Sequence, residues 1–227
     1  MTKSRILIIA SFPESVVTFR GPLIRAMREA GARVAVAVPD AGRNAKVAAE
    51  LAEMGVDAYE VPLRRTGTNP ISDLALVVSL YSLVRRLRPS AVLSYTAKPV
   101  IYGSIAAWLA GVPSRCALIT GVGYAFTGKR EGLLTRLVRF LYQLSLARVN
   151  KVFFQNPDDE RMFREMGLVQ DHTPSVVVNG SGVDLSFFEP ASQPPGDAVF
   201  LMIGRLLGDK GVREYAQAAR RVRALHP

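Results

Sequence analysis

The stretch Arg5-Ile-Leu-Ile-Ile-Ala10 decides the fold, because it is a short, uninterrupted apolar run rich in isoleucine. Such runs are typical of strands that are buried on both faces of a parallel sheet. Residues 22–30 follow with apolar side chains at helical spacing and stop at Gly31, a residue that suits the end of a helix. Residues 33–38 then return to the pattern of a strand. This order of strand, helix and strand indicates an α/β fold.

The same alternation continues along most of the chain, with residues 11–18 expected to form the first loop. It predicts a Rossmann-like parallel sheet with helices on both faces. The further elements expected are strands at 57–61, 91–94, 115–120, 151–155 and 175–178, and helices at 44–54, 70–87, 100–110, 133–149 and 157–166.

The last part of the chain begins a second unit of the same kind. Residues 189–197 carry three prolines and one glycine, a composition typical of a linker, and the segments 198–203 and 211–225 predict one more strand and one more helix. The sequence therefore predicts a complete domain in residues 1–188, the linker, and an incomplete second Rossmann-like domain in 198–227. Because one strand and one helix cannot enclose a core, we expect these 227 residues to be part of a longer, two-domain protein.

The composition narrows the class of protein and its partners. The chain is 49% hydrophobic and 21% charged, which is ordinary for a globular protein, and no apolar run approaches the length of a membrane span. A single cysteine, Cys116, excludes an intrachain disulfide framework, so a cytoplasmic location is expected. The net charge of +10 favours anionic lipid or phosphorylated small molecules. Nucleic acid is not expected as a partner, because the sequence has no zinc-ligand pattern and no clear helix-turn-helix.

Three segments that follow predicted strands carry residues suited to an anionic or sugar ligand, and open α/β sheets bind ligands at such places. Arg20 lies at the expected start of the first helix, where a cation opposes the helix dipole unless an anion is bound nearby. Thr96 and Lys98 follow the fourth strand, and the fifth is followed by a glycine-rich loop with an aromatic side chain, which contains Gly121, Gly123 and Tyr124. The dinucleotide-binding and P-loop glycine motifs are both absent after the first strand, which argues against a nicotinamide enzyme and a P-loop ATPase.

A further candidate site lies near residue 204, where the predicted strand 198–203 leads into a turn and then a helix. Gly204, Arg205, Lys210 and Gly211 have the spacing Gly-Arg-x-x-x-x-Lys-Gly. A helix N-terminus offers free backbone N–H groups and a positive dipole end, and the two cations would add formal charge. The residues therefore predict a site for a phosphate or diphosphate.

These motifs together resemble retaining glycosyltransferase family 4, whose GT-B fold consists of two facing Rossmann-like domains. The pieces that carry the resemblance are the Phe19-Arg20-x-Pro22 sequence, the Thr96-Ala-Lys98-Pro sequence, the Gly121-Val-Gly-Tyr124 loop, the sequence Asn179-Gly180-Ser-Gly182-Val-Asp184, and the Gly-Arg-x-x-x-x-Lys-Gly stretch. They resemble most closely a bacterial subgroup that builds surface polysaccharides or glycan precursors on lipid-diphosphate carriers.

The resemblance implies an enzyme that transfers a hexose or N-acetylhexosamine from a nucleotide sugar, expected to be UDP-linked, to a lipid-linked or saccharide acceptor. It implies that the donor diphosphate binds at Gly204, Arg205, Lys210 and Gly211, and that Arg20, Thr96, Lys98, Gly121, Gly123 and Tyr124 line the acceptor side. It also implies an interdomain hinge at Asn179, Gly180, Gly182 and Asp184. No metal cofactor is expected, because the sequence has no Asp-x-Asp pair.

Two departures from the family pattern keep alternatives open. The E-x7-E region that contacts the donor is absent, and Ala97 occupies a place where several relatives have a catalytic histidine, so no catalytic residue is assigned. A nucleotide-sugar 2-epimerase of the same fold and a non-catalytic acceptor-binding subunit of a split glycosyltransferase are the alternatives. A missing set of acids and histidines argues against the epimerase, and the segment beyond the linker argues against the split subunit.

The predicted helix 133–149 is basic and amphipathic. Arg136 and Arg139 lie within it, Lys129 and Arg130 precede it, Arg148 and Lys151 lie at its end, and leucines occupy its other side. Such a helix can lie on an anionic membrane surface or pack its apolar side against the core. The sequence leaves both interpretations open, and the first would place the protein at the inner face of a membrane.

Overall fold

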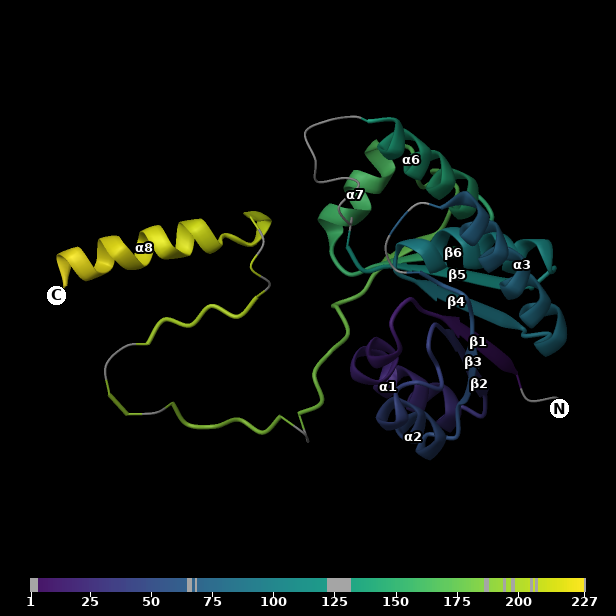
Figure 1. Ribbon diagram of the computed structural model, residues 1–227, viewed down its shortest axis with the longest axis horizontal. Helices are drawn as coiled ribbons and strands as arrows, with labels where there is room; N and C mark the ends of the chain where they lie inside the picture. Colours follow the sequence, from purple (N-terminus) through teal and green to yellow (C-terminus); the bar gives the residue numbers. More distant parts are fainter. Residues whose placement is uncertain are drawn as a thin grey trace. The chain divides into compact units, whose positions relative to one another are not determined.

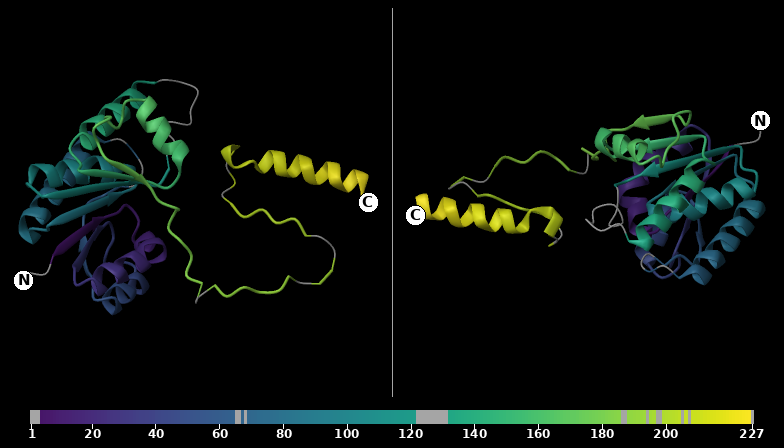
Figure 2. Two further views of the ribbon diagram at one scale, coloured as in Figure 1. Left: turned by 180° about the vertical axis from the view of Figure 1, so that it is seen from behind. Right: turned by 90° about the horizontal axis from the view of Figure 1, so that it is seen from above.

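The computed structural model describes residues 4–64, 67, 69–121, 132–185, 188–193, 195–196, 199–204, 206 and 208–226. The chain divides into two compact units, Met1–Asp184 and Leu185–Pro227. The first unit holds a parallel sheet with helices on both faces, as Figures 1 and 2 show. The predicted fold class is therefore confirmed.

Within the described ranges, the sheet has seven parallel strands in the order β3-β2-β1-β4-β5-β6-β7. The central strand β1 pairs with β2 on one side and with β4 on the other. After Arg5 its residues are all apolar, and Leu7, Ile8 and Ile9 are fully buried because helices cover both faces of the sheet. The strands are β1 (Arg5–Ile9), β2 (Arg33–Val38), β3 (Asp57–Glu60), β4 (Ala91–Tyr95), β5 (Ser114–Ile119), β6 (Lys151–Phe154) and β7 (Ser175–Val177).

Two layers of helices cover this sheet. Alternate residues of β1 point to opposite faces: Leu7 and Ile9 join a core with α3 and α4, whereas Ile8 packs with α1 and α2. A third core surrounds Phe154 and Phe163, whose rings meet edge to face. The helices of this unit that the structure describes are α1 (Pro13–Glu29), α2 (Ala45–Glu53), α3 (Pro70–Leu87), the π-helix η1 (Pro99–Gly103), α4 (Ser104–Leu109), α6 (Leu133–Leu146) and α7 (Pro157–Glu165).

The first helix is longer than the sequence predicted. Residues 11–18 were expected to form a loop, but α1 begins at Pro13, a residue whose fixed φ suits the first helical position. Pro22, the expected start, lies inside the helix. Arg20 is consequently a mid-helix residue, so the expected opposition between its charge and the helix dipole does not arise.

The helix predicted at 100–110 begins as the π-helix η1 and continues as α4. Gly103, at the junction, lies against the sheet: an added Cβ would stand 2.8 Å from Ser94 Oγ and 3.0 Å from Ile9 Cδ1. Only glycine allows this close approach without displacing its neighbours. The π-helix therefore packs directly against β4, the strand that precedes Thr96 and Lys98.

The second unit contains the short 3₁₀-helix η2 (Gly208–Lys210) and α8 (Val212–Leu225), and no residue of α8 is buried. The predicted helix 211–225 is confirmed, but the predicted strand 198–203 is not, because residues 199–203 are not in a strand. A strand is stable only when neighbouring strands satisfy its backbone N–H and C=O groups. The residues that the structure describes supply no such neighbour for this segment.

Candidate functional site

The sheet order changes direction at β1 and β4, and parallel sheets of this kind bind ligands beyond the carboxyl ends of such strands. Ser11 follows β1, Thr96 follows β4, and their hydroxyl oxygens are 2.7 Å apart. Thr96 has φ +68°, a left-handed conformation that is unusual for a β-branched residue. Strained residues of this kind concentrate at functional sites. The hydrogen bond between Ser11 and Thr96 connects the two halves of the sheet at this edge.

Arg20 is buried beneath this edge and has no carboxylate partner among the described residues. Its Nη1 donates a hydrogen bond of 2.7 Å to Ser181 Oγ, and its guanidinium stacks over the ring of Tyr95 at 4.9 Å. Burial lowers the pKa of Arg20 from its ordinary value, although a guanidinium remains charged at neutral pH. Its Nε is buried without a hydrogen-bond partner among the described residues, so one donor is unsatisfied.

The contact between Arg20 and Ser181 fixes the predicted hinge against α1. Ser181 also accepts a hydrogen bond of 3.2 Å from Gln155 Nε2. The glycines on either side, Gly180 and Gly182, have φ near +70°, a conformation that favours glycine. Asp184 lies 3.7 Å from Arg25 in an exposed pair, which contributes little to stability. Asn179 completes the segment, and its proposed role as an interdomain hinge stays a prediction.

Lys98 is engaged within the protein. Its Nζ lies 2.7 Å from Asp73 Oδ1, and Tyr102 donates a hydrogen bond of 2.7 Å to the other oxygen of the same carboxylate. Both charged side chains are largely buried. Burial, followed by the neighbouring Asp73, raises the pKa of Tyr102. The charge that sequence reasoning assigned to ligand binding is thus balanced by Asp73.

Sequence reasoning missed Asp73. The only signal was an acid in the first turn of a predicted helix, where acids are common because they complement the helix dipole. Nothing in the spacing connects it to Lys98, which is 25 residues away.

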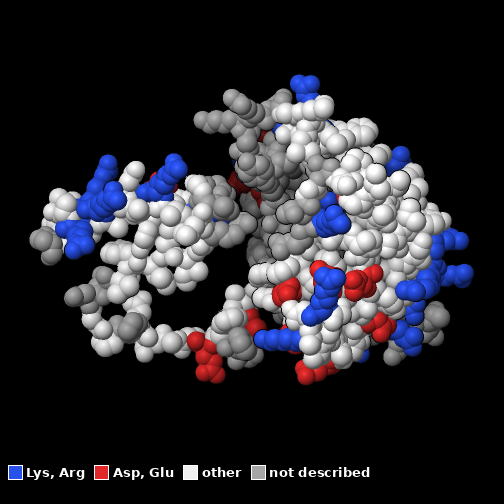
Figure 3. All heavy atoms as spheres, viewed as in Figure 1, with Lys and Arg blue, Asp and Glu red and all other residues white. Residues whose placement is uncertain are grey.

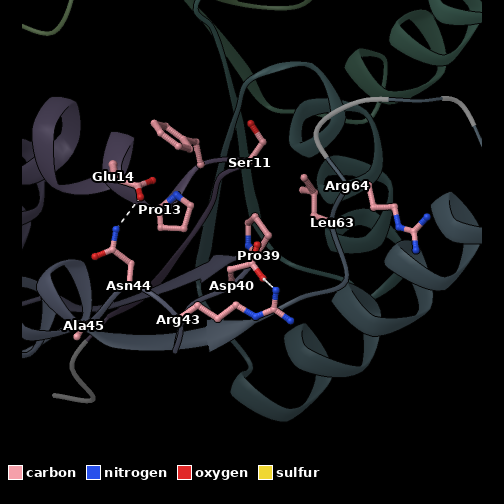
Figure 4. A pocket seen from close by; sticks show the side chains of 11 residues that line it. Ser11, Pro13, Glu14, Pro39, Asp40, Arg43, Asn44, Ala45, Leu63 and Arg64 are labelled. Carbon is pink, nitrogen blue, oxygen red and sulfur yellow. Dashed lines mark hydrogen bonds and ion pairs between the residues drawn. The ribbon is translucent and has the colours of Figure 1, made fainter.

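A cavity of about 690 Å³ lies beyond the carboxyl ends of β1, β2 and β3. Figure 4 shows its lining, which comes from three separate segments of the chain. Ser11 belongs to this lining and, through its bond to Thr96, joins the cavity to the centre of the sheet edge. The described residues that line it are Ser11, Phe12, Pro13, Glu14, Pro39, Asp40, Arg43, Asn44, Ala45, Leu63 and Arg64.

Glu14, in this lining, has a buried hydrogen-bonding atom without a partner among the described residues. Asn44 Nδ2 donates a hydrogen bond of 2.6 Å to Glu14 Oε1, while Asn44 Oδ1 accepts from the backbone N–H of Val47 and caps α2 (Figure 4). The other carboxylate oxygen, Oε2, is buried and has no partner among the described residues. Buried polar atoms are almost always hydrogen-bonded, so a carboxylate oxygen without a described partner in the wall of a cavity is suited to accept a hydrogen bond from a ligand hydroxyl or amide.

Two cations lie at the rim of the same cavity. Arg43 pairs with Asp40 at 3.1 Å in an exposed interaction. Arg64 is exposed, and in Figure 4 its guanidinium points away from Glu14 and Asn44. The cavity therefore has a buried acceptor without a described partner in its wall and the exposed guanidinium of Arg64 at its rim.

No predicted site residue that the structure describes in the first unit lines this cavity. Gly121 is exposed with φ +131°, and Gly123 and Tyr124 lie outside the described residues. In the second unit Gly204 and Lys210 are exposed, and Gly211 takes a left-handed conformation just before α8. Arg205 lies outside the described residues, so the predicted diphosphate site remains a prediction.

A comparison with known protein families matches most of this chain. The model of the glycosyl transferase 4-like domain matches residues 16–180. The chain belongs to this family. The match covers the elements from within α1 to the glycine-rich segment after β7, which includes Arg20, Asp73, Thr96 and Lys98.

Two curated bacterial proteins are similar to this member of the glycosyl transferase 4-like family. One is the N,N'-diacetylbacillosaminyl-diphospho-undecaprenol alpha-1,3-N-acetylgalactosaminyltransferase of Campylobacter jejuni, 26% identical over 95% of this chain and 60% of that protein. The other is the UDP-Gal:alpha-D-GlcNAc-diphosphoundecaprenol alpha-1,3-galactosyltransferase of Escherichia coli, 31% identical over 73% of this chain and 44% of that protein. The chain thus spans about half the length of these relatives.

Solved structures share the fold at low identity. Sucrose-phosphate synthase of Thermosynechococcus elongatus superposes with a TM-score of 0.62 at 11% identity, over 83% of this chain and 51% of that one. A UDP-N-acetylglucosamine 2-epimerase gives 0.57 at 13% identity, over 79% and 49%. At these identities the likeness establishes the fold alone.

Within the described residues, no helix combines the length and the apolar character needed to cross a membrane.

Proposed function

We propose that this chain supplies the acceptor-binding part of a glycosyltransferase that moves a sugar from a nucleotide sugar to a lipid-diphosphate-linked acceptor in cell-surface glycan synthesis. The two curated relatives support this class of reaction, because the names of both describe transfer to a sugar on a diphosphate-linked undecaprenol. The name of the second relative also supports a UDP-linked donor.

The observation that carries the proposal is the cavity beside β1, in whose lining Glu14 Oε2 is buried and has no partner in the part of the chain that the structure describes. A sugar ring offers several hydroxyl donors, and a carboxylate that accepts from one of them fixes its orientation. We propose that the cavity binds the sugar of the acceptor and that Arg64 at the rim attracts its diphosphate. Arg20, Thr96, Lys98 and Gly121 shape the adjoining edge of the sheet.

The donor would bind to the second unit. We propose that Gly204, Arg205, Lys210 and Gly211 hold the donor diphosphate, with Arg205 and Lys210 neutralising the charge of the leaving group. This part of the proposal rests on the Gly-Arg-x-x-x-x-Lys-Gly spacing and on the helix α8 that follows it. We further propose transfer with retention of configuration and without a metal, and action from the cytoplasmic side of an anionic membrane.

The epimerase alternative is supported only by likeness of fold, whereas the relatives that match by sequence carry glycosyltransferase names. An epimerase acts on one nucleotide sugar and has no need of an acceptor. Binding of a lipid-linked sugar therefore separates the two.

The proposal is tested by calorimetric titration of the chain with α-N-acetylglucosaminyl diphosphate carrying a short citronellyl chain, a water-soluble analogue of the acceptor. Saturable binding of the analogue with a Kd between about 1 μM and 1 mM supports acceptor binding, provided that added UDP does not weaken it. The absence of saturable binding, or displacement of the analogue by UDP, contradicts it.

A further inference from the structure

We propose that the outer surface of α3, α4 and α6 docks onto an anionic lipid bilayer. The inference deepens the proposed function by assigning the surface through which the protein would reach a lipid-linked acceptor. It rests on the exposed side chains, charges and direction of these three helices.

The three helices lie next to one another on one side of the sheet, since α4 contacts both α3 and α6. Figure 2 shows α3 and α6 on that same side. Each helix buries one face in the core and exposes large apolar side chains on another. We call these exposed side chains the apolar helix surface: Ile71, Leu74, Val78, Tyr81, Trp108, Leu109, Leu133, Leu134, Leu137, Phe140 and Leu144.

The helix α6 has two apolar faces, one in the core and one exposed. The sequence had suggested a single apolar side, which would face either the core or a membrane. Its core side consists of Tyr142, Ser145 and Leu146, with Val138 and Leu141 partly buried against them. Most of the leucines expected to face the core are exposed instead. The helix therefore has a second apolar face, and contiguous exposed apolar surface of this kind marks an interaction site.

The charges on these helices match an anionic partner. Neither α4 nor α6 contains an acidic residue, and the one acid of α3, Asp73, is buried against Lys98. Arg85 and Arg136 are exposed on α3 and α6, and Arg148 lies over the ring of Trp108 at 4.5 Å. Figure 3 shows the region over α3 and α6 as mostly uncharged with Lys and Arg around it, while acids gather over α1 and α2. Apolar side chains bordered by arginines and without exposed acids suit the boundary between acyl chains and anionic headgroups.

The direction of the helices connects this surface to the candidate site. A helix that joins parallel strands runs back from their carboxyl ends, so the first turns of α3 and α6 lie at the edge that carries the cavity (Figure 1). Exposure is greatest there: Ile71 is 80% exposed and Leu133 85%, against 38% for Tyr81 and 40% for Leu144 near the other ends. A bilayer that contacts these first turns would present a diphosphate-linked sugar close to the cavity.

A second copy of this chain fits the surface less well than a bilayer. Self-association through the apolar helix surface would bring the arginines of two copies together without exposed acids from these helices to balance them, and such like-charge contacts oppose association.

The test is co-sedimentation of the 227-residue chain with vesicles of equal parts phosphatidylcholine and phosphatidylglycerol, compared with vesicles of phosphatidylcholine alone. The chain is expected to bind the anionic vesicles at least about tenfold more tightly, with an affinity that falls as salt is raised. Equal binding to both vesicles, or no binding to the anionic ones, overturns the proposal.

Two double variants locate the contact. Leu134→Gln with Leu137→Gln on α6, and Ile71→Gln with Leu74→Gln on α3, are each expected to weaken binding to anionic vesicles by about tenfold, because they remove apolar area from the interface. The matched control is Phe19→Gln with Leu23→Gln, which changes two exposed apolar residues of α1 on the opposite side of the sheet and should leave binding unchanged. An equal loss in the control overturns the assignment, as does a wild-type dimer, seen by light scattering, that the α3 or α6 variants dissociate.

Titration of the same double variants with the water-soluble acceptor analogue separates this inference from the proposed function. Normal binding of the analogue together with absent vesicle binding contradicts the docking surface alone. Normal vesicle binding without binding of the analogue contradicts the acceptor site alone.

Discussion

Two groups of polar side chains beyond the carboxyl ends of the strands differ in how fully they are satisfied. Asp73, Lys98 and Tyr102 form a closed group, in which both carboxylate oxygens of Asp73 are paired. Glu14 and Asn44, at the cavity, form an open group, in which one buried carboxylate oxygen has no described partner. From this difference we infer a structural role for the first group, and for the second the proposed role in binding the acceptor.

The largest expected effect is on the closed group. Asp73→Ala leaves Lys98 largely buried without its counter-charge and should lower the free energy of unfolding by about 3 kcal/mol, measured by urea denaturation. Asp158→Asn is the control, because its pair with Arg161 is exposed and should contribute less than about 0.5 kcal/mol. A similar small loss for both variants would show that the closed group does not stabilise the fold.

A somewhat smaller effect is expected at Arg20, which links α1 to the segment that contains Ser181. Arg20→Met should cost about 2 kcal/mol, because it leaves Ser181 without its charged donor and removes the stacking on Tyr95. Amide hydrogen exchange should accelerate in residues 179–184. Arg25→Met, which removes only the exposed pair with Asp184, should change neither quantity; unchanged exchange in Arg20→Met would contradict the proposed link.

The open group should respond in binding and not in stability. Glu14→Gln keeps the shape and the bond to Asn44 but removes the charge, and it should weaken binding of the citronellyl analogue by about tenfold in calorimetry. Glu29→Gln, an exposed change on the same helix, is the control. If Glu14→Gln instead lowered stability and left affinity unchanged, the open group would be structural.

The smallest effect concerns pH. The pKa of Tyr102 is raised in the folded protein by burial and by Asp73, so the protonated phenol is favoured in the folded state. Its contribution to stability is complete below the ordinary tyrosine pKa of about 10 and is lost as pH rises above that value. Tyr102→Phe should therefore unfold with a shallower dependence on pH above about 10 than the wild type. Identical slopes would show that Tyr102 does not contribute to it.

The sequence predicted the fold well because patterns of strands and helices are local. The run from Arg5 and the glycines at helix ends identify the alternation without any tertiary information. The strand 198–203 was wrong for the opposite reason: its apolar residues have the pattern of a strand, but pairing depends on neighbours that the described chain does not provide.

The candidate site was less predictable. Arg20 and Lys98 were found by their charge and position, yet their partners, Ser181 and Asp73, lie far away in sequence and are brought close only by the fold. Glu14 was overlooked because its segment reads as a loop, whereas Pro13 starts a helix there and the carboxylate turns toward Asn44. Hydrogen bonds between distant segments leave no spacing signal in a single sequence.

The most direct test of the account is to map where the acceptor binds. A diazirine derivative of α-N-acetylglucosaminyl diphosphate with a citronellyl chain would be photo-crosslinked to the chain, and the labelled residues identified by mass spectrometry. The account predicts labels in residues 11–14 and 39–45, which line the cavity, and loss of those labels with excess unlabelled analogue. Labels confined to the segments around Asp73 and Lys98, with none at the cavity, would contradict it.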